Sequence, residues 1–152
     1  MENALAENAS GRVRLADLIL LLGRLLLALI FLHEGATLAA DMTATLAAFQ
    51  KLGLPAIVTF GVVALQLGAG LSVAGGLLSR LGSVALGLFC LATAFLFHTN
   101  FASQNELLHF EKDLAIAGGM FVLAVGGAGS ISIDNLVKRQ VKELHPWLKA
   151  VL

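Results

Sequence analysis

The sequence has few charged residues and a single cysteine. Of its 152 residues only 13% are charged, with ten basic and ten acidic side chains, and it has no basic tract interleaved with aromatic residues. Proteins that bind nucleic acid carry such basic patches, so we expect no nucleic-acid partner. Because Cys90 is the only cysteine, one chain can form neither an internal disulfide nor a CxxC pair. We interpret Cys90 as a packing residue within a hydrophobic segment.

The motifs of several common enzyme classes are also missing. The sequence has no GxGxxG loop after a strand, no phosphate loop, no GxSxG and no HExxH. Each of these motifs places glycines, a nucleophile or metal ligands where one particular chemistry needs them. Nucleotide or flavin binding by a known loop, serine hydrolysis and zinc proteolysis therefore lack support. The motifs leave open whether the protein is an enzyme.

Apolar residues and glycine are abundant instead. The chain is 58% apolar, contains sixteen glycines and has a mean hydropathy of +0.88, which is typical of a multi-pass membrane protein. About 20 apolar residues cross the hydrocarbon core as a helix. The sequence therefore predicts an all-α membrane protein, a four-helix transmembrane bundle over residues 15–130 with interfacial amphipathic helices. The four spans are predicted at residues 15–38, 55–78, 81–97 and 114–128.

The segments outside the spans indicate an orientation. We expect residues 1–14 to form a cytoplasmic N-terminal tail, residues 39–54 an amphipathic helix at the interface, and residues 131–152 a cytoplasmic interfacial helix. Seven basic residues share the side of the two termini, whereas only Lys51 and Lys112 lie on the other side. By the positive-inside rule, both termini are predicted to be cytoplasmic.

Arg24 lies within the first span and is the first candidate for a functional residue. A guanidinium near mid-bilayer costs from a few to more than 10 kcal/mol, so it is expected to face other helices or a wet cavity. At 1.5 Å per residue, Arg24 lies roughly 20 Å down the first span and Gln66 roughly 16 Å down the second, close enough in depth to meet. A ligand could complete this pair. Alternatively, Arg24 pairs with Asp17, two turns back on the same face, and only stabilises the bundle.

Other polar side chains are predicted near the outer ends of the spans. Glu34, His98 and Lys112 come from spans one, three and four and could form one polar vestibule, to which Asp113 could also contribute. Helix geometry places His33 almost opposite Arg24, so these two residues are not expected to share a pocket. An alternative role for His33 and His98 is to bind haem from two sides or, with Glu34, a divalent metal. Their spacing is not diagnostic for either ligand.

Several segments resemble the DoxX family of small four-span bacterial membrane proteins. The matching pieces lie in order along nearly the whole chain: GRLLLALIFLHEG at 23–35, KLGLP at 51–55, LSVAGGLLSRLGSVAL at 71–86, TAFLFH at 93–98, FEKDLAIAGG at 110–119 and GAGSISID at 127–134. Arg24, His98 and Lys112 match the family pattern. Gln66 and Leu38 depart from it, because family members commonly carry a glutamate and a lysine at those places.

The resemblance implies a protein of the bacterial inner membrane linked to sulfur or quinone redox chemistry. Our first hypothesis is that the bundle binds a quinone-like molecule, with Arg24 and Gln66 donating hydrogen bonds to its carbonyls and with His98 and Lys112 exchanging protons. Glu34 completes the predicted ligand-binding set. A quinone is the favoured cofactor and haem the less favoured one. The alternatives are a non-catalytic accessory subunit that docks onto a partner membrane or periplasmic redox protein, and a pathway for a small solute or ion.

Overall fold

The computed structural model describes residues 14–140. Most of the predicted N-terminal tail and the last part of the predicted C-terminal helix, including Trp147, lie outside the described residues. Within residues 14–140 the secondary structure is entirely helical. The described helices are α2 (Leu15–Ala40), α3 (Met42–Lys51), α4 (Ala56–Gly75), α5 (Ser79–Phe97), α6 (Gln104–Gly126) and α7 (Ile133–Gln140).

Three of these helices are long and apolar enough to cross a membrane. They are α2, α4 and α5, and they coincide with the first three predicted spans. Helix α6 has 23 residues, but its first part is polar, so its crossing of the membrane stays a prediction. The helical content and the three candidate spans confirm the predicted all-α membrane protein.

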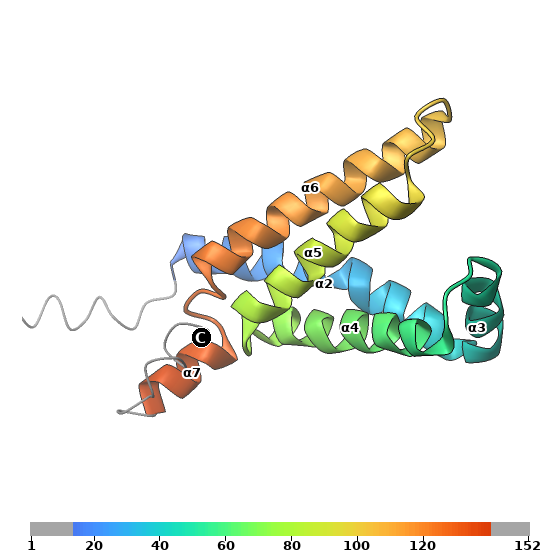
Figure 1. Ribbon diagram of the computed structural model, residues 1–152. Coiled ribbons are helices and arrows are strands. Elements are labelled where there is room, and N and C mark those ends of the chain that lie inside the picture. Colours follow the sequence, from blue (N-terminus) through green and yellow to red (C-terminus); the bar gives the residue numbers. More distant parts are fainter. Residues whose placement is uncertain (1–13, 141–152) are drawn as a thin grey trace, which may run out of the picture.

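The long helices form two antiparallel pairs. Helix α2 packs along α4, and α5 packs along α6, with α4 and α5 joining the pairs. Figure 1 shows the two pairs close together at the end where α7 lies and spread apart toward the end where α3 crosses the tip of the α2–α4 pair. We call these the α7 end and the α3 end of the bundle. The helix pairs are therefore farther apart at the α3 end than at the α7 end.

Close contacts between the helices depend on small residues, as the glycine content predicts. A Cβ atom at Gly70 would lie 2.9 Å from a methyl carbon of Leu32, and one at Gly82 would lie 2.8 Å from Ser72 Oγ. Not every glycine marks a close contact between helices, since Gly68 has nothing within 4 Å of its Cβ position. The core between the helices includes Cys90, which is 3% exposed and so packs as predicted.

The turn between α4 and α5 differs from the predicted one. Residues 79 and 80 are expected to form the turn, but α4 ends at Gly75 and α5 already begins at Ser79. Gly76 adopts a left-handed conformation with φ +68°, which is the usual way a helix ends at a glycine. The backbone N–H groups of Leu78 and Ser79 donate to the Asp134 carboxylate, at 2.8 and 3.3 Å. A side chain distant in sequence therefore fixes where α5 begins.

Helix α6 also begins earlier than predicted. Residues 101–110 are expected to form a polar loop, but the helix starts at Gln104. The polar residues of its first turns do not break the helix because they bond to α5: Glu106 pairs with His98, and Asp113 accepts from Thr93. Tertiary contacts thus outweigh the polar composition on which the loop prediction rested.

Candidate functional site

Arg24 lies at the α7 end and holds a loop. It is 3% exposed, and it donates through Nη1 to Ala128 O at 2.6 Å and through Nη2 to Ile131 O at 3.0 Å. Both acceptors belong to the segment between α6 and α7. The predicted partners of Arg24 are wrong: Asp17 instead accepts from the Arg14 backbone N–H at 2.9 Å, and Gln66 lines different cavities.

The offset between α2 and α4 explains why Arg24 and Gln66 do not meet. Gly76 lies against Arg24, whereas a Cβ on Gly35 would be 3.1 Å from the Gln66 Cβ. Gln66 is therefore level with Gly35, about three turns along α2 from Arg24. The depth estimate counted both spans from one outer plane, but the contact between Gly35 and Gln66 shows that α4 begins beyond the end of α2.

At the same end, Asp134 joins α7 to the start of α5. This residue is 2% exposed, and it accepts from the Ser79 hydroxyl at 3.1 Å besides the two backbone donors already described. Its own backbone N–H donates to Gly76 O at 2.8 Å. The SISID sequence by itself predicts only a cap for the last helix. Ser132 does cap α7, since its Oγ accepts from the Asn135 backbone N–H at 3.2 Å, but the bridging role of Asp134 was not foreseen.

The other four predicted site residues come together at the α3 end. Glu34, Gln66, His98 and Lys112 all line one cavity of about 340 Å³, which we call the polar lobe. The four long helices each contribute to its wall. The remaining lining residues are Ile30, Phe31, Phe89, Cys90, Thr93, His109, Asp113 and Ile116.

Hydrogen bonds and ring stacking hold several side chains around the polar lobe in place. His98 Nδ1 lies 2.8 Å from Glu106 Oε2, and the His98 ring stacks on His109 with centroids 5.1 Å apart. Thr93 Oγ1 donates to Asp113 Oδ2 at 2.9 Å. Glu106 and His109 are not among the site residues predicted from the sequence. Their spacing along one face of α6 is the signal that could have found them, once the segment is taken as helical.

Gln66 is the most buried polar residue of this site. Its side chain is 6% exposed, and its Oε1 is buried with no hydrogen-bond partner among the described residues. A buried amide normally finds partners, because an unmade hydrogen bond costs about 1–3 kcal/mol. A buried amide oxygen without a protein partner indicates a place where a ligand group or a water molecule would bind.

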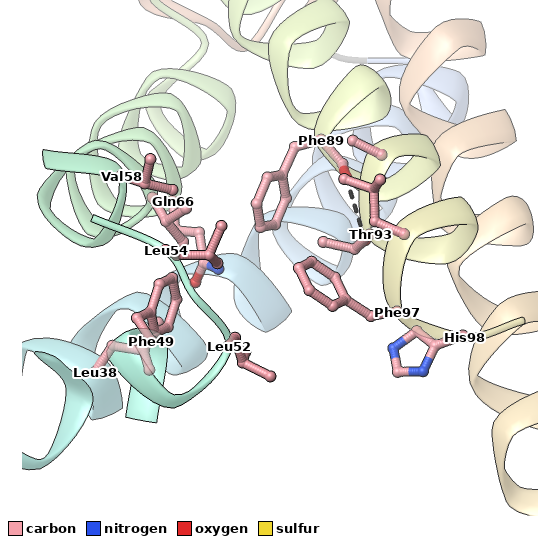
Figure 2. Close-up of a pocket in the computed structure, with 13 residues that line it drawn as sticks. Leu38, Phe49, Leu52, Leu54, Val58, Gln66, Phe89, Thr93, Phe97 and His98 are labelled. Atoms are coloured by element: carbon pink, nitrogen blue, oxygen red, sulfur yellow. Dashed lines mark hydrogen bonds between the residues drawn. The ribbon is translucent and has the colours of Figure 1, made fainter. Parts of the chain in front are cut away.

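A second, apolar cavity joins the polar lobe at Gln66. This apolar lobe has a volume of about 430 Å³ and shares Gln66, Phe89, Thr93 and His98 with the polar lobe. Figure 2 shows the Gln66 amide on one side of the space and Phe89, Thr93 and Phe97 on the other. The rest of its wall comes from Leu38, Phe49, Leu52, Leu54, Val58, Val62, Ala92 and Leu96.

The described residues offer little for a metal. No group of three or more His, Cys, Asp or Glu side chains in residues 14–140 is arranged to hold one. His33 is exposed and lines neither lobe, so it does not share a pocket with His98. The site is better matched to an organic molecule that has one polar and one apolar part, because the two lobes differ in this way and share Gln66, Phe89, Thr93 and His98.

Fold and site together define an all-helical membrane protein with an amphipathic cavity inside its bundle. The family model for DoxX matches residues 19–99. The chain belongs to the DoxX family. It is 35% identical to inner membrane protein YqjF of Escherichia coli over 84% of this chain and 98% of the relative. It is 27% identical to inner membrane protein YphA of the same organism over 77% of this chain and 89% of the relative. No solved structure matches.

Proposed function

We propose that the protein binds a quinone-like molecule in the two lobes at the α3 end. The polar ring of such a molecule would lie in the polar lobe against Gln66, and its apolar chain would lie in the apolar lobe. The observation that carries the proposal is the buried and unpaired Gln66 Oε1 at the junction of the lobes. When bound, a quinone supplies the reversible uptake of two electrons and two protons, which the side chains here do not provide.

Gln66 suits both redox forms of such a ligand. An amide offers an acceptor oxygen and two N–H donors. Its Oε1 can accept from a ring hydroxyl, and its Nε2 can donate to a ring carbonyl. A neutral amide therefore holds either form without a change in its own charge, which fits a place otherwise lined largely by apolar side chains.

Proton exchange would use the groups nearer the mouth. His98 and Glu106 are hydrogen-bonded and are 26% and 31% exposed, so they link the polar lobe to solvent. Lys112 and Glu34 are exposed at the rim, where they would steer a polar ring and hold protons for exchange. In this assignment Arg24 takes no part in ligand binding, because it lines neither lobe.

We also propose the bacterial inner membrane as the location, with both termini in the cytoplasm. The support for the membrane is the similarity to two inner membrane proteins. The support for the orientation is that seven basic residues lie on the side of the termini and two on the other side. Four crossings, with α6 as the last, would place both lobes toward the periplasmic side.

The test is equilibrium binding of a short-chain quinone to the purified full-length protein in mild detergent. We expect Gln66→Leu to weaken binding roughly tenfold, because one hydrogen bond in an apolar site is worth about 1.4 kcal/mol. Gln104→Leu is the matched control, since Gln104 is an exposed glutamine on α6 that lines neither lobe. Both substitutions keep the side-chain volume about the same and remove one amide group.

Two results would contradict the proposal. One is a wild-type protein that binds no quinone while it stays folded by circular dichroism, and the other is equal binding by Gln66→Leu and wild type. If the protein then copurifies stoichiometrically with another membrane subunit, the accessory role replaces the redox role.

A further inference from the structure

A separate polar cavity at the α7 end has the chemistry of an anion site. It has a volume of about 200 Å³ and is lined by the 126–129 glycine-rich turn together with Arg80, Ser132, Asp134, Asn135 and Lys138. None of these residues lines the two lobes of the proposed quinone site. Ligand pockets for drug-sized molecules run to about 300–1,000 Å³, so this cavity suits a smaller group.

Arg80 presents part of its guanidinium to this cavity. Its Nη1 donates to Ala124 O at 3.0 Å and to Val125 O at 2.7 Å, which fixes the plane of the group. Its Nε and Nη2 bond to no acceptor among residues 14–140. A Cβ on Gly127 would lie 3.1 Å from Nη2, so the glycine keeps the space beside these donors clear.

The one carboxylate in the cavity wall, Asp134, is held by hydrogen bonds from neutral donors and keeps its charge. Both Asp134 carboxylate oxygens accept hydrogen bonds from the first residues of α5. Lys138, by contrast, is exposed, and the only ion pair within residues 14–140 is the distant one between His98 and Glu106. An incoming anion would therefore meet two cations, Arg80 and Lys138, against the single Asp134 carboxylate, and neither cation forms an ion pair within residues 14–140.

The position of the cavity narrows the class of anion. The α4–α5 turn ends two membrane helices, so this end of the bundle lies at the depth of the lipid headgroups. A planar guanidinium and a lysine form a common phosphate-binding pair, and basic pockets at helix ends bind anionic headgroups. We infer that this cavity binds a phosphate-bearing anion, through Arg80 and Lys138, at the membrane surface.

The experiment measures binding of short-chain phosphatidylglycerol to the full-length protein in neutral detergent by native mass spectrometry. Short-chain phosphatidylcholine, which is zwitterionic and has no net charge, is the comparison. We expect Lys138→Leu to weaken phosphatidylglycerol binding about tenfold and Lys138→Arg to keep it. Arg139→Leu is the matched control, because Arg139 is the neighbouring exposed cation on α7 and does not line the cavity. This control should change binding less than threefold.

A second arm and a second variant complete the test. Inorganic phosphate is added as a competitor: displacement of the lipid means that the site also takes free phosphate, and no displacement means that the lipid is the occupant. Arg80→Leu should weaken binding as Lys138→Leu does, but Lys138 decides the result because Arg80 also holds the end of α6. Equal losses in Lys138→Leu and Arg139→Leu, or no loss in either, would overturn the inference.

Discussion

The buried side chains that cross-link the α7 end are bonded within the protein, whereas Gln66 Oε1 at the α3 end is not, although Ser83 Oγ near the start of α5 is also unpaired among the described residues. At the α7 end, the Asp134 carboxylate has three donors, and Arg24 leaves only Nε of its donor nitrogens without a partner. At the α3 end, Gln66 is as deeply buried but its Oε1 has no partner. Groups that are satisfied within the protein stabilise it, whereas a group left unsatisfied beside a cavity is available to a ligand.

The same contrast appears in the shape of the bundle. The helix pairs meet where α7 and its loop close the gap, and they separate toward α3 (Figure 1). The closed end uses residues far apart in sequence as cross-links, including Arg24 with Ala128 and Asp134 with Ser79. Arg24 and Asp134 therefore hold the α7 end together, and the ligand site proposed above lies at the α3 end.

The largest effect should come from Asp134. We expect Asp134→Ala to lower the free energy of unfolding by about 3 kcal/mol, because it leaves buried backbone donors of Leu78 and Ser79 without an acceptor. The measurement is thermal unfolding in detergent. Asp134→Asn is the control, since it keeps one acceptor oxygen and should lose less. If Asp134→Ala unfolds at the wild-type temperature, Asp134 does not join α7 to α5 as described.

An intermediate effect is expected for Arg24. Arg24→Leu should destabilise the protein by about 2 kcal/mol, since two carbonyl acceptors lose a charged donor. In the fraction that stays folded, quinone binding should equal that of wild type. Lower stability together with unchanged quinone binding would show that Arg24 has a structural role and does not bind the ligand. Loss of quinone binding without loss of stability would show that Arg24 binds the ligand. The two ends of the bundle would then not differ in this way.

The smallest effect on stability should come from the α3 end. His98→Phe removes a partly exposed pair with Glu106, and pairs of this kind are worth about 0–1 kcal/mol. We expect an unfolding temperature close to that of wild type, together with weaker quinone binding. Glu106→Gln should behave in the same way for stability. A large destabilisation by either variant would show that this end is also cross-linked by its polar residues.

Prediction from the sequence succeeded for features that depend on one segment of the chain alone. Long apolar runs gave α2, α4 and α5 close to their observed bounds. The prediction that Glu34, His98 and Lys112 lie together near the outer ends of the spans agrees with the polar lobe, whereas Gln66 was paired with Arg24 instead. The partner of Arg24 was missed because its acceptors lie 104 and 107 residues away. The start of α6 was missed because its polar residues are satisfied by α5.

The sequence by itself determined that this is an all-helical membrane protein of the DoxX family, because apolar length and motif order are properties of the chain alone. Only the tertiary structure decided that Arg24 holds a loop while Gln66 faces a cavity. That decision depends on how far α4 is shifted along α2, and the shift is set by close contacts such as Gly35 against Gln66 and Gly76 against Arg24. Hydropathy carries no information about such an offset, because every register buries similar apolar faces.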